Sequence, residues 1–288
     1  MYKITGKRRL NDNMTWLEIE APLVARKALP GQFIILRTDE KGERIPLTMA
    51  GYSRDKGTVE IIYAAVGRTT MLLDQLNEGD FLCDVAGPLG RPTEMEGLKR
   101  VCVVGGGTGN ALAFGLVKGF HTEGIKVDTI AGFKSRDFVI LEKEFNEISE
   151  NLYIVTDDGS YKEKAFTTDK LKQLLADGNN YDEIIAVGPP VMMKLVCGIA
   201  QEAGIKSVAS LTAYMIDGTG MCGGCRVIIG GESRFVCVDG PEFDGLQVNF
   251  DEAMQRQQIY KTAEGRAYLA AKEGATHHGG CGNCGGND

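Results

Sequence analysis

Residues 101–120 read VCVVGGGTGNALAFGLVKGF, and this stretch decides the fold class. Four apolar residues are followed by a run of glycines and then by apolar residues at helical spacing, which predicts a strand, a tight turn and a helix. The same alternation recurs downstream. Apolar strands are predicted at 127–133, 152–157, 183–188 and 207–212, with helices at 138–148, 167–176 and 191–203. Alternating strands and helices are typical of a parallel, doubly wound sheet, here of five strands and ending near Thr212.

The residues before this sheet have a different rhythm. Short alternating segments occur at 3–10, 15–21, 32–38, 58–66 and 81–87, separated by glycine, proline and asparagine. Many short strands close together indicate a small antiparallel barrel. One interruption, Thr69–Leu76, has apolar residues at helical spacing and is predicted to be the single helix of the barrel.

The residues after the sheet form smaller units. Residues 213–250 combine a loop rich in glycine and cysteine with a hairpin-like stretch at 226–240, and residues 251–272 have the pattern of one helix. A Gly-rich tail follows. We therefore divide the chain into a β-barrel, an α/β domain, a cysteine module, and a helix with its tail, at 1–97, 98–212, 213–250 and 251–288.

The composition limits the class of protein. The chain has 288 residues, of which 43% are apolar, enough for two packed domains and an appendage. Its 32 basic side chains are outnumbered by 39 acidic ones, and the net charge of −7 argues against nucleic acid or an anionic membrane as a partner. The start of the chain lacks the apolar core of a signal peptide, and no segment reaches the roughly 18 apolar residues of a membrane span. We expect a cytoplasmic protein.

The chain has eight cysteines, and in a reducing cytoplasm clustered cysteines are more often metal or cluster ligands than disulfides. Cys83 and Cys102 lie in apolar strand-like runs, and Cys197 lies in a helix-like run. These three are predicted to be small buried residues of the core.

The strongest motif of the chain is Asp217-x4-Cys222-x2-Cys225-x11-Cys237. A [2Fe-2S] cluster usually takes four thiolates, and the plant-type spacing of the first three is C-x4-C-x2-C. Cysteine holds three of the four places, and Asp217 holds the first, where its harder carboxylate oxygen can still bind iron. The alternative role for Asp217 is to cap the loop. A zinc ribbon would need a second C-x2-C pair, whereas Cys237 stands alone on a predicted strand.

A second motif lies in the turn after the first strand of the sheet. Its residues are Gly105, Gly106, Gly107, Thr108, Gly109 and Asn110. Glycines let the backbone approach a pyrophosphate, and the helix N-terminus offers N–H groups and positive potential. Asn110 stands where the Rossmann pattern G-x-G-x-x-G has its third glycine. The sequence G-G-G-x-G-x-A instead resembles the ferredoxin-NADP reductase superfamily, in which a flavin barrel precedes a nicotinamide domain. A tight turn that binds no ligand is the alternative.

The turn after the fourth strand of the sheet also carries candidate nucleotide contacts. Gly188, Pro189 and Met192 resemble the C-G-P-x-x-M that lies near the nicotinamide in this superfamily. Val187 replaces its cysteine, so any thiol assistance to hydride transfer is lost. A helix start capped by proline and packed by methionine is the alternative.

Charged residues after the second and third strands bear on the choice of nucleotide. Asp157 and Asp158 would repel the 2′-phosphate of NADP(H), whereas Lys134 or Arg136 would attract it. These two indications conflict. NAD(H) is favoured, and NADP(H) is not excluded.

The barrel contains a stretch that is similar to the flavin signature R-x-[YP]-[ST] of the same superfamily. This stretch is Arg44-Ile45-Pro46-Leu47-Thr48, in which Leu47 intervenes before the hydroxyl residue. By this resemblance, Arg44 binds a phosphate of FAD through its two-pronged guanidinium, and the main chain around Pro46, Leu47 and Thr48 addresses the flavin ring. A polar edge strand is the alternative explanation for Arg44.

Two further segments of the barrel are assigned to FAD. Gly67, Thr69 and Thr70 open the predicted helix, where N–H groups and hydroxyls are expected to hold the pyrophosphate. A simple helix cap would explain the two threonines equally well. Gly87 and Gly90 resemble the turn that closes the flavin barrel.

Taken together, residues 1–250 resemble the electron-transfer subunit of dihydroorotate dehydrogenase B and its relatives, the sulfide dehydrogenase subunit and the small subunit of NADH-dependent reduced ferredoxin:NADP oxidoreductase. Asp217 and the R-I-P-L-T stretch are similar to the last, electron-bifurcating branch. The resemblance implies NAD(H), FAD and a [2Fe-2S] cluster as cofactors, and a larger flavin and iron–sulfur subunit as partner in a hetero-oligomer. No catalytic acid–base pair or Ser-His-Asp set is recognisable, which fits a chain whose cofactors carry the chemistry.

Two other functions remain open. One is a self-sufficient NAD(P)H reductase for ferredoxin or an oxygenase, and the other is a non-redox zinc or nucleotide-binding module. The helix at 251–272 is expected to dock on the partner or on this chain's own barrel. His277, His278, Cys281 and Cys284 have a spacing that suits a metal, and a plain polar tail is the alternative.

Overall fold

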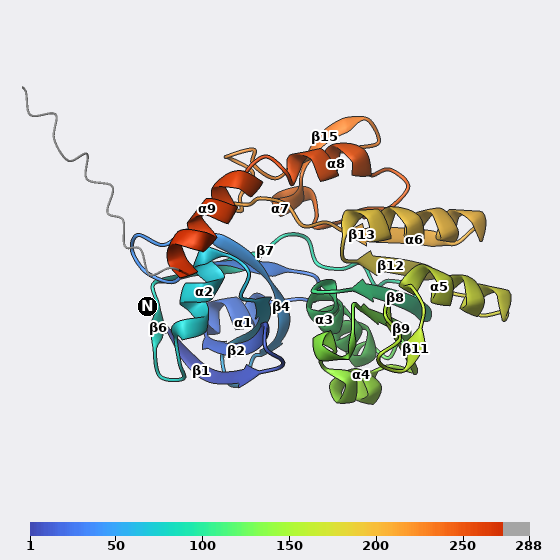
Figure 1. The fold of residues 1–288 in the computed structure, drawn as a ribbon, viewed down its shortest axis with the longest axis horizontal. Coiled ribbons are helices and arrows are strands. Elements are labelled where there is room, and N and C mark those ends of the chain that lie inside the picture. Colours follow the sequence, from blue (N-terminus) through green and yellow to red (C-terminus); the bar gives the residue numbers. More distant parts are fainter. Residues whose placement is uncertain (273–288) are drawn as a thin grey trace, which may run out of the picture.

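The computed structural model describes residues 1–272 and places two sheet-based halves side by side (Figure 1). The N-terminal half is an antiparallel sheet with strand order β6-β1-β2-β5-β4-β3-β7. Its strands are β1 (Tyr2–Arg9), β2 (Met14–Glu20), β3 (Phe33–Arg37), β4 (Ile45–Ser53), β5 (Thr58–Ala64), β6 (Phe81–Leu82) and β7 (Asp84–Leu89). Alternate side chains such as Leu17, Ile19 and Ile61 point inward and are fully buried, so the sheet curls around its own core as predicted for a barrel.

Two helices accompany the barrel, whereas the sequence predicted one. The expected helix is α2 (Arg68–Gln75), whose Leu73 is fully buried in the barrel core. The second is α1 (Pro22–Lys27), which buries Val24 and Ala25. Because α1 has only six residues, it is too short to show helical periodicity, and only its proline at the first turn marks it.

The second half contains the predicted parallel sheet. Its strand order is β11-β10-β9-β8-β12-β13-β16. The five central strands are β8 (Arg100–Gly106), β9 (Lys126–Phe133), β10 (Asn151–Thr156), β12 (Glu183–Val187) and β13 (Lys206–Ser210), and all pair in parallel. In chain order they lie as third, second, first, fourth and fifth, so the direction of winding reverses between β8 and β12.

Helices cover both faces of this sheet, as its doubly wound topology requires. The helices are α3 (Gly109–Thr122), α4 (Glu142–Ile148), α5 (Thr167–Ala176) and α6 (Pro190–Glu202), with a 3₁₀ turn at Arg136–Phe138. Phe114 of α3 and Phe145 of α4 pack edge-to-face on one side, where Val103 of β8 points. Val196 of α6 packs on the other side, with Cys102 of the same strand.

Two short edge strands extend the predicted sheet. The strand β11 (Glu163–Lys164) pairs in parallel with β10, and β16 (Glu242–Asp244) pairs antiparallel with β13. Strands of two or three residues are too short to show an alternating pattern. Because β16 comes from the cysteine module, that module is joined to the α/β sheet by main-chain hydrogen bonds.

The predicted hairpin at 226–240 is shorter than expected. It consists of β14 (Arg226–Ile229) and β15 (Glu232–Phe235), and a helical turn, α7 (Val236–Asp239), follows. Cys237 therefore lies on a helical turn and not on a strand. The physical reason is a side-chain cap, because the carboxylate of Asp239 accepts a hydrogen bond of 2.8 Å from the N–H of Phe235 and closes the turn.

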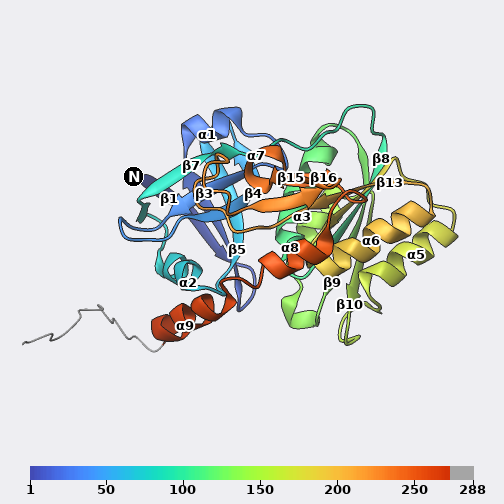
Figure 2. The ribbon, with the colours of Figure 1, turned by 90° about the horizontal axis from the view of Figure 1, so that it is seen from above.

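The predicted helix at 251–272 is two helices, α8 (Phe250–Arg256) and α9 (Lys261–Lys272). A continuous helix would bond the carbonyl of Gln257 to the N–H of Lys261. That carbonyl instead accepts from the Tyr214 hydroxyl at 3.0 Å, and Lys261 bonds to Gln258 at 3.2 Å. The chain therefore changes direction between α8 and α9 and continues towards the barrel (Figure 2).

The two C-terminal helices form a band from the α/β half to the barrel, seen from above in Figure 2. The helix α8 rests on α6 and β14, and α9 lies against α2 of the barrel. The expectation that this segment packs on the chain's own barrel is therefore met by α9. The candidate metal residues of the tail, His277, His278, Cys281 and Cys284, lie outside the described residues.

The three cysteines assigned to the core differ in burial. Cys102 and Cys197 are buried, as predicted. Cys83 is only half-buried, because it lies at the break between β6 and β7, where the guanidinium of Arg37 reaches its sulfur at 3.6 Å. Among the helices of residues 1–272, none combines the length and the apolar character that crossing a membrane requires.

Candidate cofactor sites

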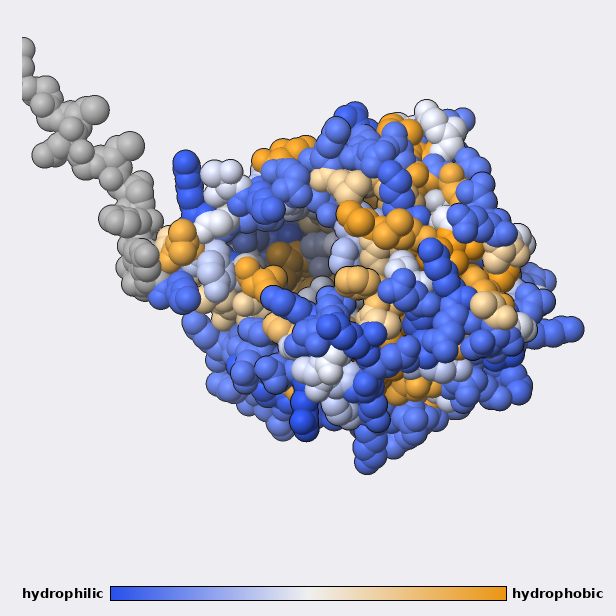
Figure 3. Space-filling model, turned by 45° about the vertical axis from the view of Figure 1, so that its right-hand side comes forward, coloured by the Kyte–Doolittle hydropathy of each residue, from blue (hydrophilic) through white to orange (hydrophobic). Residues whose placement is uncertain are grey.

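The main candidate site is a cavity of about 320 Å³ between the two halves. Figure 3 shows this side of the molecule hollowed, with hydrophobic residues in the floor of the hollow. One wall comes from β4, β5 and the start of α2, and the other from the first turn of α3 and the ends of β12 and β13. The predicted site residues that line it are Pro46, Leu47, Thr48, Thr70, Thr108, Gly109 and Gly188.

Several lining residues were not predicted from the sequence. Phe33 and Tyr63 come from the barrel, Leu211 and Met215 follow β13, and Pro241 precedes β16. The position of Leu211 directly after the last parallel strand was a usable signal, because ligands of open α/β sheets bind at the carboxyl ends of strands. Phe33, Tyr63 and Pro241 carry no such mark, since they read as core or turn residues.

The hydroxyls at the start of α2 are engaged within the chain. Thr70 accepts from the N–H of Gly67 at 2.9 Å and donates to its carbonyl at 3.0 Å, which forms a cap. Thr69 is buried and donates to the carboxylate of Glu43. What this end of α2 offers a phosphate is therefore its backbone N–H groups, which lack partners inside the helix, together with the helix dipole.

Arg44 lies away from the cavity. Its Nε donates to the carbonyl of Ile216 at 2.8 Å, and its Nη1 forms an ion pair of 3.0 Å with Asp84. The resemblance assigns Arg44 to an FAD phosphate, whereas here its guanidinium faces the loop that carries Asp217. The residues of the flavin signature therefore lie at two places. Pro46, Leu47 and Thr48 line the cavity, whereas Arg44 contacts the cysteine module.

The two glycines assigned to the turn that closes the barrel support its shape. An added Cβ at Gly87 would stand 2.9 Å from a methyl carbon of Ile34. Gly90 has a φ of +77° and packs against the ring of Phe33, and its carbonyl accepts from Gln32 at 2.8 Å. Neither glycine lines the cavity, so their contribution to the site is to place Phe33.

The glycine-rich turn lies close to the turn after β12. A Cβ at Gly106 would stand 2.4 Å from the sulfur of Met192, and one at Gly109 would stand 2.4 Å from the carbonyl oxygen of Val187. At Gly109 only glycine permits this approach, because the facing atom belongs to the backbone. Gly105 lies one step further inside, against the side chain of Asn110.

The side chain of Asn110 holds the glycine-rich turn in place through hydrogen bonds. It is fully buried, and its Nδ2 donates to the carbonyls of Gly107 at 3.0 Å and Gly132 at 2.9 Å. The prediction of direct cofactor contact does not fit this placement. The asparagine instead ties the turn to β9, which keeps the helix N-terminus in place for a ligand.

A second cavity of about 190 Å³ lies at the carboxyl edge of the same sheet, next to this turn. The predicted site residues that line it are Gly106, Gly107, Asp157, Pro189 and Met192. Its other lining residues are Gly132, Phe133, Lys134, Phe166 and Thr167. Burial, followed by the nearby charge of Asp158, raises the pKa of Asp157.

Of the four charged residues that bear on the choice between NAD(H) and NADP(H), only two line this cavity. Asp158 accepts from the N–H and the hydroxyl of Ser160 at 2.9 and 2.7 Å and does not line the cavity. Arg136 stacks over the ring of Tyr161, with 5.5 Å between the guanidinium and the ring centre. Asp157 and Lys134 therefore remain as the acidic and the basic side chain that line this cavity.

The four candidate cluster ligands lie in two pairs. Cys222 Sγ and Asp217 Oδ1 are 3.3 Å apart, and Cys225 Sγ and Cys237 Sγ are also 3.3 Å apart. Two ligands on one tetrahedral ion with bonds of 2.0–2.3 Å stand roughly 3.3–3.8 Å apart. Each pair therefore has nearly the spacing that one iron requires. Within residues 1–272, no three histidine, cysteine or carboxylate side chains surround one point as for a single metal ion.

The first pair is exposed and the second is buried. Cys222 is exposed, whereas Cys225 and Cys237 are each 1% exposed. Burial, together with the neighbouring thiol of Cys225, raises the pKa of Cys237. Metal binding displaces such protons, since thiolates are the ligands.

Asp217 is held by the loop that follows it. Its carboxylate accepts from the backbone N–H of Met221 at 2.8 Å and Cys222 at 3.1 Å, and from both the N–H and the hydroxyl of Thr219. Desolvation opposes ionisation, but the hydrogen bonds from the Cys222 side chain and from these N–H groups prevail and lower the pKa of Asp217 to about 2. The carboxylate is thus charged and oriented towards Cys222. Three thiols and one charged carboxylate in two pairs fit a binuclear iron–sulfur group.

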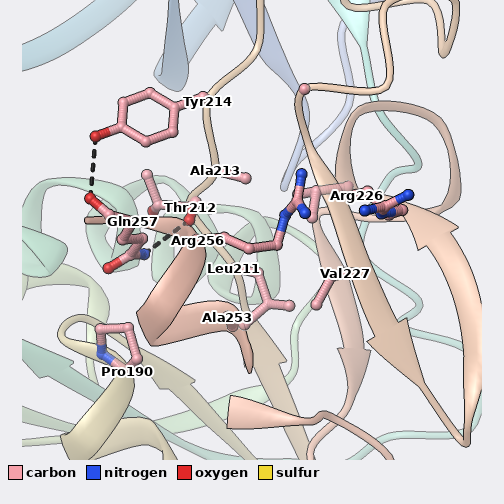
Figure 4. A pocket seen from close by; sticks show the side chains of 12 residues that line it. Pro190, Leu211, Thr212, Ala213, Tyr214, Arg226, Val227, Ala253, Arg256 and Gln257 are labelled. Carbon is pink, nitrogen blue, oxygen red and sulfur yellow. Dashed lines mark hydrogen bonds between the residues drawn. The ribbon is translucent and has the colours of Figure 1, made fainter. Parts of the chain in front are cut away.

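A small pocket behind the cysteine module shows how the C-terminal band is attached (Figure 4). The Tyr214 hydroxyl donates to the carbonyl of Gln257, and Nε2 of Gln257 donates to the carbonyl of Thr212 at 2.9 Å. The ring of Tyr214 also packs edge-to-face on Tyr260, with 5.1 Å between centres. These contacts fix the segment that leads from β13 into the cluster loop and that lines the large cavity.

A barrel and a doubly wound sheet that share a cavity, with a cysteine loop beside them, define the class of ferredoxin reductase-like electron-transfer proteins. Comparison with known proteins narrows the class. Residues 212–249 match the model of the iron-sulfur cluster binding domain of dihydroorotate dehydrogenase B. The chain is 51% identical to an uncharacterized protein of Clostridium beijerinckii, with 98% of each chain covered.

A named relative and a solved structure complete the comparison. The chain is 41% identical to a Thermotoga maritima homolog of the dihydroorotate dehydrogenase B (NAD(+)) electron transfer subunit, over 92% of this chain and 94% of the relative. A chain in a structure of NADH-dependent reduced ferredoxin-NADP oxidoreductase, solved to study flavin-based electron bifurcation, is 39% identical with a TM-score of 0.88, over 93% of this chain and 97% of that one. This chain belongs to the family of dihydroorotate dehydrogenase B electron-transfer subunits, and it is an electron-transfer subunit.

Proposed function

We propose that this chain carries electrons between NAD(H), FAD and a [2Fe-2S] cluster, and exchanges them with a larger flavin and iron–sulfur subunit. The observation that carries this proposal is the arrangement of two ligand pairs beside a cavity that the barrel and the α/β half share. When bound, the nucleotide and the flavin supply hydride chemistry and the cluster supplies single-electron transfer.

The residues of the large cavity bind and orient the reacting rings. On the barrel side, the main chain of Pro46, Leu47 and Thr48 would address the flavin ring, and the N-terminus of α2 would hold its pyrophosphate. On the opposite side, Thr108 and Gly109 open α3 and would receive the nucleotide. A ring from each side would then meet inside the cavity, in the orientation that its two walls set.

The lining of this cavity suits hydride transfer. Along its described wall there is no charged side chain, and the polar groups are backbone and hydroxyls such as those of Tyr63 and Ser210. A hydride moves directly between two rings, so orientation is what the protein must provide. A charged acid or base at this place would be needed for a different reaction class.

At the smaller cavity, the N–H groups of the glycine turn would address the pyrophosphate, and Asp157 would accept hydrogen bonds from the adenosine ribose. An acid at that position supports NAD(H) over NADP(H), since a carboxylate repels a 2′-phosphate.

Asp217, Cys222, Cys225 and Cys237 would hold the [2Fe-2S] cluster. Within the family, we favour the electron-bifurcating NADH-dependent ferredoxin:NADP oxidoreductase type. A carboxylate at the first ligand position and the match to a structure of that enzyme support this assignment. The alternatives are the electron-transfer subunit of dihydroorotate dehydrogenase B or of sulfide dehydrogenase, and a stand-alone NAD(P)H:ferredoxin reductase.

The test is anaerobic purification with measurement of FAD, iron and the electron paramagnetic resonance (EPR) spectrum after reduction by dithionite. We expect one FAD and two irons per chain and a binuclear signal. Cys225→Ser should lose the iron and keep the FAD, whereas Cys83→Ser, outside the cluster loop, should keep both. A colourless wild-type protein would refute the proposal. Isolation of the native complex would identify the partner, and a chain that reduces ferredoxin alone would favour the stand-alone alternative.

A further inference from the structure

The loop that carries the first ligand pair rests directly on the barrel. Gly218 has a φ of +77°, and an added Cβ would stand 2.7 Å from Cδ1 of both Ile35 and Leu89. Ile35 lies on β3 and Leu89 on β7, so the loop is pressed against the edge of the barrel sheet. Apolar contact alone fixes the distance but not the orientation of the peptide groups in the loop.

Arg44 supplies an oriented contact at the same place. Its Nε donates at 2.8 Å to the carbonyl of Ile216, which is one residue before the candidate ligand Asp217. The other edge of its guanidinium is anchored on the barrel by the ion pair with Asp84 at 3.0 Å. The rigid fork of an arginine side chain can satisfy both partners at once, which the single ammonium of a lysine cannot reproduce in the same geometry.

A second arginine makes a matching contact beside the last ligand. Arg91 Nε donates at 3.3 Å to the carbonyl of Val238, one residue after Cys237. Its backbone N–H donates to the carbonyl of Gly240 at 2.7 Å, and its guanidinium lies 3.8 Å from the carboxylate of Asp239. Because the Arg91 side chain is 70% exposed, its contact is the weaker of the two.

We propose that Arg44 is a positioning residue for the cluster, which it serves by holding the Ile216 carbonyl and thereby the orientation of Asp217 relative to the flavin barrel. Arg91 supports the opposite side of the site. This inference rests on the proposed cluster. Outer-shell partners that orient ligands tune the affinity and the potential of a metal site, and a fixed positive charge nearby favours the reduced, more negative state of a cluster.

The test compares Arg44→Met and Arg44→Lys with the wild-type chain and with Arg54→Met. Arg54 is a matched control, because it also donates to a backbone carbonyl, that of Ala28 at 3.2 Å, but does so elsewhere on the barrel. The measurements are FAD and iron per chain, the EPR spectrum of the reduced protein, and the midpoint potential of the cluster from a redox titration.

We expect Arg44→Met to keep FAD and iron at wild-type stoichiometry while its EPR g-values change and its midpoint potential falls. The potential falls because a positive charge is lost and Asp84 is left without its partner. Arg44→Lys should lie between Arg44→Met and wild type, since the charge is kept but the fork is lost. Arg54→Met should match the wild type in every measurement.

Two results would overturn the inference. If Arg44→Met lost FAD but kept the wild-type EPR signal of the cluster, Arg44 would be a ligand of the FAD phosphate. If the variant kept both FAD and the wild-type EPR signal, Arg44 would have no role at either cofactor. Where Arg44→Met fails to fold, the EPR spectrum of Arg44→Lys decides, and identity with the wild type refutes the proposal. A wild-type chain without a binuclear signal would instead refute the proposed function.

Discussion

Gly109→Ala should separate nucleotide chemistry from cofactor retention. An alanine Cβ at Gly109 would stand 2.4 Å from the carbonyl oxygen of Val187 and 2.7 Å from Cα of Gly188. Both neighbours are backbone, so no side chain can rotate away. The turns after β8 and β12 must then move apart by about 1 Å, and a misplacement of that size near reacting groups costs on the order of 10²-fold in rate.

Hydride transfer from NADH to FAD should therefore slow by about 100-fold in Gly109→Ala, because Gly109 and Gly188 both line the large cavity. The content of FAD and iron should stay at the wild-type level, since the barrel and the cysteine loop are other parts of the chain. The assay is anaerobic stopped-flow measurement of flavin bleaching over a range of NADH concentrations, which separates the affinity from the limiting rate.

Gly198→Ala is the matched control. Gly198 lies inside α6, and an added Cβ there meets nothing within 4 Å. A helical glycine replaced by alanine gains roughly 0.5–1 kcal/mol of stability, and flavin reduction should keep the wild-type rate. If Gly109→Ala also reduced FAD at the wild-type rate, the reasoning from the close approach of the two turns would be refuted.

The remaining predictions concern ligation, stability and pH. Asp217→Cys should keep two irons per chain and change the EPR spectrum and midpoint potential, whereas an unaffected spectrum would show that Asp217 is no ligand. Asp128→Asn should lower the free energy of unfolding by about 2 kcal/mol, because Asp128 is fully buried and forms an ion pair of 2.7 Å with Arg100. The loss is no larger because the guanidinium of Arg100 is partly exposed and can be hydrated in the variant. Urea denaturation measures this change, and an unchanged midpoint would contradict the prediction. Burial raises the pKa of Glu242 to about 7, so its ionisation costs stability as pH rises from about 4.5 through 7. Glu242→Gln should therefore have a higher free energy of unfolding than wild type at pH 8, by about 1–2 kcal/mol, but not at pH 4. Urea denaturation at both pH values measures this difference, and equal gains at pH 4 and pH 8 would count against it.

The sequence by itself determined the units and their order. The strand, glycine turn and helix at 101–120, and the later repeats of that alternation, predicted the central parallel strands, because periodicity reports which face of an element is buried. The spacing of Cys222 and Cys225 after Asp217 predicted the cluster module, since ligands of one group must follow each other at short loop distances. These signals are local, so no tertiary contact was needed to find them.

Only the tertiary structure decided which distant residues meet. It joined β16 to the parallel sheet, put Cys237 on a helical turn, and divided the flavin signature between the cavity and the cluster loop. Arg44 and Ile216 are 172 residues apart in sequence. They can form a hydrogen bond because Gly218, which has no side chain, allows the loop to pack closely against Ile35 and Leu89 of the barrel. A pattern along the chain states that a side chain is polar or apolar and on which face it stands. Which partner it finds there depends on how the finished units pack, and that is a property of the whole fold.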